Sequence, residues 1–97
     1  MLHIINKSAL SNGSFDSCLR TATGEILLIE DAVYAATKGS VLEAKVRDAM
    51  GHFKINVLMP DLEARGLADR ILEGVTPVDY GGFVELVAGN KNCQSWL

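Results

Sequence analysis

The chain has 97 residues, the length of one small domain, and a formal net charge of −3 with no cluster of lysine and arginine. A nucleic-acid binder needs a basic surface against the phosphates, and a membrane span needs an apolar run of about 20 residues. The chain has neither. We therefore expect no direct contact with nucleic acid or with a membrane.

Hydrophobic residues make up 48% of the chain. A domain of this length buries only about 60–65% of its unfolded surface, so this is more apolar material than a small monomer can easily hide. One interpretation is that another chain covers part of the surface. The other is a dense parallel-sheet core, which is also rich in valine, isoleucine and leucine.

Short apolar runs alternate with amphipathic stretches along the chain. Residues 2–5 predict a first strand, and Ser14 is a suitable N-cap for the helix that follows. The apolar face of that helix is formed by Phe15, Cys18, Leu19 and Ala22. Residues 25–29, EILLI, contain a continuous apolar run, as is typical of a strand buried on both faces.

The middle of the chain predicts two helices and a strand. A short helix is expected over 32–39, and a second helix, capped by Ser40, ends near Gly51. Residues 53–59 predict the third strand. Pro60 and Asp61 then predict a turn.

The last third predicts a weak helix over 67–72, a short strand over 75–78 and an edge strand over 93–97. Asp79 is expected to cap the final helix, with one face formed by Tyr80, Phe83, Val84 and Val87. The pattern as a whole predicts an α/β fold. It is a single small domain over residues 1–97, with a mainly parallel sheet of about five strands flanked by helices.

Two cysteines, Cys18 and Cys93, are too few for a disulfide framework, and the N-terminus lacks the features of a signal peptide. We therefore expect a cytoplasmic protein. Cys18 lies on the apolar helix face. It is either a reactive thiolate that handles sulfur or a small buried hydrophobe. Cys93 is interpreted as a tail residue without a role.

Glu30 and Asp31 follow the predicted central strand, and ligands of open α/β sheets bind at the carboxyl ends of the strands. The pair is able to bind Mg²⁺, but capping of the next helix with a polar contact to another subunit is the favoured interpretation. Trp96 is expected to dock on this chain or on a neighbour. No motif for nucleotides or hydrolysis and no histidine spacing for a metal occurs, so we predict no cofactor and no metal.

Four segments carry a resemblance to a known family: MLHIINKS, EILLIEDAVYAA, VLMPDLEARGL, and VDYGGFVELV with the terminal QSWL. Their order, spread over the whole chain, resembles the DsrH/TusB family. The resemblance implies a small α/β fold that assembles with DsrE/TusD-like and DsrF/TusC-like subunits into a heterohexamer. Such a complex relays sulfur as a cysteine persulfide.

In the Tus branch the resemblance implies transfer from TusA to TusE, toward 2-thiolation of the wobble uridine in tRNA. In the Dsr branch it implies dissimilatory sulfur oxidation with DsrC as the acceptor. The main sulfur-carrying cysteine of the family belongs to the DsrE/TusD subunit, which makes this chain a non-catalytic or accessory subunit. Cys18 matches a first-helix cysteine of DsrH-type members and is a candidate persulfide carrier.

The expected contacts with other subunits are Glu30, Asp31 and Trp96. A third hypothesis, independent of the relay, is a homo-oligomeric α/β module that binds a small ligand at the strand ends.

Overall fold

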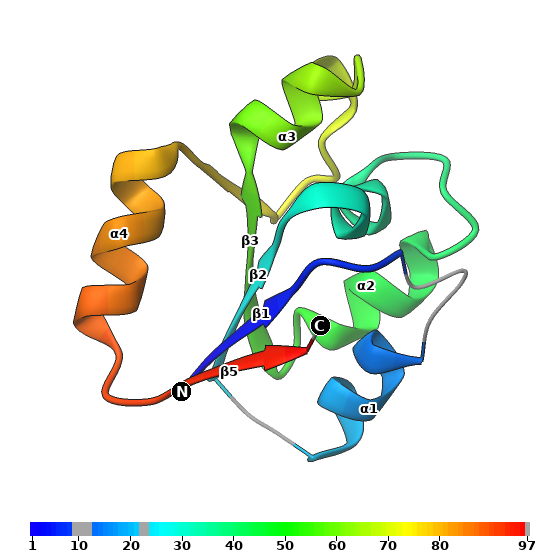
Figure 1. The fold of residues 1–97 in the computed structure, drawn as a ribbon. Coiled ribbons are helices and arrows are strands. Elements are labelled where there is room, and N and C mark those ends of the chain that lie inside the picture. Colours follow the sequence, from blue (N-terminus) through cyan, green and yellow to red (C-terminus); the bar gives the residue numbers. More distant parts are fainter. Residues whose placement is uncertain (9–12, 22–23, 97) are drawn as a thin grey trace.

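Five parallel strands form one sheet in the computed structural model, which describes residues 1–8, 13–21 and 24–96. The sheet order is β4-β3-β2-β1-β5 (Figure 1). The strands are β1 (Leu2–Ile5), β2 (Gly24–Leu28), β3 (Phe53–Leu58), β4 (Thr76–Val78) and β5 (Cys93–Trp96). All four pairings are parallel, which confirms the predicted fold class.

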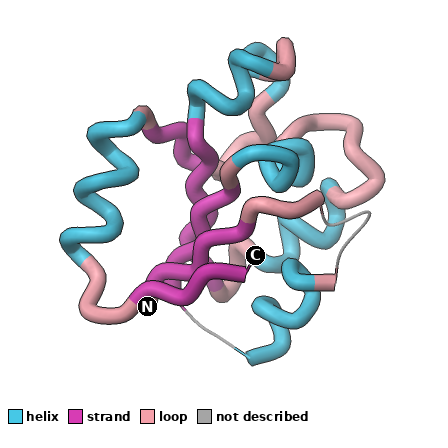
Figure 2. Tube along the Cα trace, viewed as in Figure 1, coloured by secondary structure: helices cyan, strands magenta, loops and turns pink. Residues whose placement is uncertain are grey.

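The helices are divided unequally between the two faces of the sheet. They are α1 (Ser14–Thr21), η1 (Glu30–Ala36), α2 (Glu43–Ala49), α3 (Met59–Ala64), η2 (Ala68–Arg70) and α4 (Tyr80–Gly89), where η marks a 3-10 helix. From β1 to β4 each connection steps in the same direction, and right-handed crossovers then place their helices on one face. The connection from β4 to β5 steps back across the sheet, so α4 lies on the opposite side from α1 and α2 (Figures 1 and 2).

The core lies mainly between the sheet and the larger group of helices. Alternate residues of β2 and β3, such as Ile26 and Ile55, face this core, whereas Leu27 and Leu58 face the α4 side, and all four are at most 3% exposed. Burial on both faces is the reason why these two strands are rich in isoleucine, leucine and valine. The buried amide of Asn56 donates to the Ile26 carbonyl at 3.2 Å, which satisfies a polar group in this setting.

Several predicted boundaries differ from the structure. The helix expected over 32–39 is the 3-10 helix η1, which already begins at Glu30. The turn predicted at Pro60 and Asp61 is wrong, because both residues belong to α3. Proline is tolerated in a first helical turn, where its missing N–H has no partner to lose.

Two further helix predictions are corrected. The helix expected over 67–72 is reduced to the three residues of η2. Ser40 accepts a hydrogen bond from the Leu42 amide at 3.1 Å, but α2 begins only at Glu43. Ala22, expected on the first helix, and Leu97, expected in the last strand, lie outside the described residues.

Gly24 begins β2 in a conformation that other residues rarely adopt, with φ of 118°, and a β-carbon there would lie 2.5 Å from the Met1 carbonyl oxygen. We expect Gly24→Ala to lower the free energy of unfolding by about 2–4 kcal/mol, from backbone strain plus this clash. Gly39→Ala is the matched control, because Gly39 has φ of 79° but a β-carbon there would meet no atom within 4 Å. It should cost about 1 kcal/mol. Urea titration measures both, and equal costs would contradict the clash.

Candidate functional site at the carboxyl ends of the strands

The chain turns sharply where β2 ends. Glu30 has φ of 49°, in the left-handed region that costs a residue with a side chain about 1–2 kcal/mol. The carboxylate of Asp61, in α3, accepts a hydrogen bond from the Glu30 amide at 2.6 Å. This bond holds the strained residue in place and joins the end of β2 to the first turn of α3.

A second contact joins the same two segments. Arg65 donates from Nη2 to the Asp31 carboxylate at 3.1 Å, and from Nη1 to the Asp61 carbonyl at 3.1 Å. Glu30, Asp31, Asp61 and Arg65 therefore form one group, which we call the strand-end cluster. Neither Glu30 nor Asp31 caps η1 through its side chain, but both charges lie in its first turn, where the helix dipole favours them.

The strand-end cluster is open to solvent. The Asp31 side chain is 68% exposed, so its ion pair with Arg65 is screened and contributes little to stability. No group of three metal-ligating side chains occurs among the described residues. The cluster presents an exposed acidic surface next to a single paired arginine, which suits contact with a protein more than capture of a metal.

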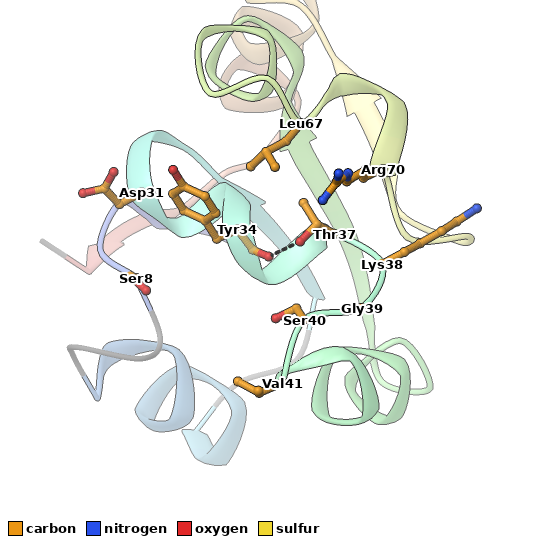
Figure 3. A pocket seen from close by; sticks show the side chains of 10 residues that line it. All are labelled: Ser8, Asp31, Tyr34, Thr37, Lys38, Gly39, Ser40, Val41, Leu67 and Arg70. Atoms are coloured by element: carbon orange, nitrogen blue, oxygen red, sulfur yellow. Dashed lines mark hydrogen bonds between the residues drawn. The ribbon is translucent and has the colours of Figure 1, made fainter.

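A pocket of about 670 Å³ lies beside the cluster (Figure 3). Asp31 and Tyr34 line one side, Arg70 lies opposite them, and Val41 lies at the far end. In the part of the chain that the structure describes, neither Lys38 nor Arg70 makes an ion pair. The pocket combines apolar walls with two basic residues and the carboxylate of Asp31.

Sequence reasoning missed this pocket because its walls come from distant segments. An antiparallel bridge between Thr37 and Ile71 brings them together, and the Lys38 amide donates to the Arg70 carbonyl at 2.7 Å. No sequence motif predicts such a contact between distant segments.

Cys18 lies in the core. Its side chain is 0% exposed on the inner face of α1, and burial raises the pKa of the thiol to about 11. At pH 7 the thiolate, which is the reactive form, is then about 0.01% of the total. This geometry favours the buried-thiol interpretation. Cys93, by contrast, is exposed and begins β5 at the other end of the sheet from the strand-end cluster.

Trp96 docks on its own chain. Its indole Nε1 donates to His3 Nδ1 at 3.2 Å, and the two ring centroids are 6.2 Å apart. The ring also packs against the core and is half-buried. Of the two alternatives for the C-terminal tail, the structure favours an anchor within the subunit. Of the four predicted site residues, Glu30 and Asp31 therefore lie together in the strand-end cluster. Trp96 and Cys18 lie outside that cluster.

Comparison with known proteins gives the family. The family described as DsrH like protein matches residues 7–93. Protein TusB of Shigella flexneri is 35% identical over 98 aligned positions, which cover 99% of this chain and 100% of that protein. The chain belongs to the DsrH/TusB family. Protein TusB of Escherichia coli O1:K1 / APEC has the same identity and coverage.

A solved structure has a similar fold. MTH1491 of Methanobacterium thermoautotrophicum, described as a protein of unknown function, superposes with a TM-score of 0.75 over 97% of this chain and 95% of that chain. The sequences are 19% identical, so this likeness shows the fold alone. Among the described residues, no helix is long and apolar enough to cross a membrane.

The structure explains the segments that resemble the DsrH/TusB family. EILLIEDAVYAA and VLMPDLEARGL meet in the strand-end cluster, through Asp61 and Arg65. MLHIINKS and QSWL meet through His3 and Trp96. VDYGGFVELV runs from the end of β4 through most of α4, where Asp79 accepts a hydrogen bond from the Gly82 amide at 2.7 Å and caps the helix as predicted.

Removing the Asp61 carboxylate should loosen the strand-end cluster. We expect Asp61→Ala to lower the free energy of unfolding by about 1–2 kcal/mol, because the Glu30 amide loses a charged acceptor while its strain remains. Asp69→Ala is the matched control, since Asp69 is exposed and its side chain makes no hydrogen bond with the described residues. Urea titration should show a change below about 0.5 kcal/mol for the control. Equal losses would refute the role of Asp61.

The two thiols should differ in reactivity. In the folded protein at pH 7.5, we expect an aromatic disulfide reagent to modify Cys93 rapidly and Cys18 only after unfolding, because Cys18 is buried with a raised pKa. Absorbance of the released thiolate counts the reacting groups. The Cys93→Ser variant should show almost no fast reaction, and a fast phase in that variant would contradict the burial of Cys18.

The raised pKa of Cys18 also has a consequence for stability. The unfolded thiol ionises near its ordinary value of 9.0 and the folded one near 11, so this contribution is complete below pH 9 and is lost as the pH rises toward 11. We expect the alkaline loss of stability to be smaller in Cys18→Ala than in the parent chain. Denaturant titrations at pH 8 and 10.5 measure the difference.

Proposed function

We propose that this chain is a subunit of a sulfur relay complex of the TusBCD/DsrEFH type. In this role it helps to pass persulfide sulfur from a TusA-like carrier to a TusE-like carrier, toward 2-thiolation of the wobble uridine in tRNA. The observation that carries the proposal is the match to Protein TusB, which covers 99% of this chain and 100% of that protein.

Burial of Cys18 supports an accessory role in that relay. In persulfide transfer, an acceptor thiolate attacks the outer sulfur of the donor persulfide. The new S–S bond forms as the old one breaks, and the donor cysteine leaves as a thiolate, so no external oxidant or reductant is required. A thiol with a pKa of about 11 and no exposed surface is poorly suited to act as the acceptor or as the donor of the sulfur. The carrier cysteine would then belong to the DsrE/TusD-like subunit.

This chain would contribute contact surfaces to the complex rather than a reacting group. Glu30 and Asp31 are exposed and contact α3, Glu30 through its amide to Asp61 and Asp31 through Arg65, and their charge suits recognition of a basic patch on another protein. Trp96 would act from within, by fixing the edge strand β5 on the core. These residues remain our candidates for contacts in a cytoplasmic complex with DsrE/TusD-like and DsrF/TusC-like chains.

The pocket favours a second candidate function. Apolar walls with Lys38 and Arg70 at the rim suit a small organic anion, in keeping with a homo-oligomeric binding module. That function requires no sulfur donor and no second kind of chain, so its expected behaviour differs from that of a relay subunit.

Co-expression with DsrE/TusD-like and DsrF/TusC-like chains tests the proposal. Native mass spectrometry should detect a hetero-oligomer, and after incubation with a carrier whose persulfide holds ³⁵S, the label should reach the DsrE/TusD-like cysteine. Deleting the gene for this chain should abolish 2-thiouridine in tRNA, measured by retardation in a mercury-containing gel. Cys18→Ala should leave both readouts within about twofold of the parent, because the thiol is buried.

Three other outcomes of these experiments would contradict the proposed function. Label on Cys18 that moves on to an acceptor would make this chain a relay station and refute the accessory role. Unchanged tRNA thiolation together with transfer to DsrC would favour the sulfur-oxidation branch. A stable homo-oligomer that ignores the other chains would refute the relay proposal and favour the binding module.

A further inference from the structure

Helix α4 is unusual in this chain because apolar side chains lie on two of its sides. Phe83 and Leu86 are half-buried on one side. On another side Tyr80, Val84 and Val87 are 63%, 66% and 39% exposed. A helix that is apolar on both sides is normally covered on both, but in the isolated subunit none of the ten residues of α4 is fully buried.

The helix is nevertheless held firmly in position. Asp79 caps its amino end, and Gly82 lies so close to β4 that a β-carbon there would be 3.0 Å from Val78 Cβ. At its carboxyl end the Asn90 amide donates to the Leu86 carbonyl at 2.8 Å and to Glu25, in β2, at 3.1 Å. The outward side is therefore a fixed surface, which we call the α4 face, formed by Tyr80, Val84 and Val87.

The charges around the α4 face indicate whether a protein or a lipid surface can cover it. Between Val78 and Lys91 the charged residues are Asp79 and Glu85, both acidic. Helices that lie on a membrane surface carry lysine and arginine beside their apolar side, to meet anionic lipid. The α4 face lacks them, so its chemistry fits a protein and opposes a lipid surface.

A second copy of this chain fits poorly. Antiparallel pairing of two α4 helices through Val84, near the helix midpoint, would bring the two Glu85 carboxylates to the same flank at the same height. Parallel pairing would bring equal ends together, with Asp79 beside Asp79 and the helix dipoles aligned. Each arrangement opposes like charges, in chains that already carry a net charge of −3.

We propose that the α4 face is the surface on which one chain of different sequence, a partner subunit of the relay complex, packs against this one. The partner would supply apolar side chains against Tyr80 and Val84 and a lysine or arginine beside Glu85. This inference rests on the proposed function and deepens it, because it places the subunit contact on the opposite side of the sheet from α1 and α2. Tyr80, an aromatic residue with a polar tip, is the expected centre of the contact.

Val84→Glu tests the proposal, with Val41→Glu as the matched control. Both valines are exposed, by 66% and 83%, but Val41 lies beside the pocket, far from α4 in the fold (Figures 1 and 3). In the complex co-expressed with both partner chains, Val84→Glu should weaken association at least about tenfold by sedimentation or native mass spectrometry. Val41→Glu should leave it unchanged. Thermal unfolding of each isolated variant checks that the fold is kept, which is expected because both positions are exposed.

A charge reversal supplies an independent readout. Glu85→Lys should also weaken the complex, and more so at low salt, if a basic partner residue lies opposite. An intact complex with both Val84→Glu and Glu85→Lys would overturn the α4 face while leaving the relay proposal in place.

The remaining outcomes are also decisive. If the parent chain forms no complex with the two partners, the relay proposal fails and the inference fails with it. Self-association of the parent chain that Val84→Glu abolishes would show that a second copy covers the α4 face, which would overturn the partner named here.

Discussion

The right-handed crossing between parallel strands is the constraint on which the arrangement of this molecule depends. Three successive connections step from β1 to β4 in one direction, and handedness places their helices on a single face. The fourth connection steps back over the whole sheet and must place α4 on the other. Among the described residues no second helix lies on that side to cover the outward face of α4, so Tyr80, Val84 and Val87 are left exposed.

The same topology gathers the strand-end cluster. Because all five strands are parallel, their carboxyl ends lie at one edge, and the segments that follow β2 and β3 become neighbours there. Asp61 and Arg65, one helical turn apart in α3, then reach the backbone of Glu30 and the side chain of Asp31. The backbone strain at Glu30 is tolerated because Asp61 accepts its amide hydrogen.

The position of Cys18 on a buried helix face explains why its thiol is a poor nucleophile. A helix that packs its apolar face on a sheet also buries any cysteine on that face, and the loss of hydration raises the thiol pKa. Cys18 lies on such a face. Cys18 is therefore a part of the core of this chain, and its burial opposes a role as an exposed thiolate.

Sequence by itself determined the parallel α/β fold, the five strands, the helix cap at Asp79 and the position of Glu30 and Asp31 after a central strand. These features depend on local patterns: alternation of apolar runs, capping residues and turns. It failed at Pro60, because a proline in a first helical turn and a proline in a reverse turn look alike without the surrounding contacts. It left the burial of Cys18 and the docking of Trp96 open.

Tertiary structure alone decided the rest. Phe83 and Val84 share one predicted helix face, yet Phe83 is half-buried and Val84 exposed, because the position of the sheet, and not the helical period, sets the inward direction. The pocket with Lys38 and Arg70 and the contact between Asp61 and Glu30 join segments about 30 residues apart. Local sequence encodes the elements, whereas contacts between them arise only when the chain has closed on itself, and the candidate sites of this protein consist of such contacts.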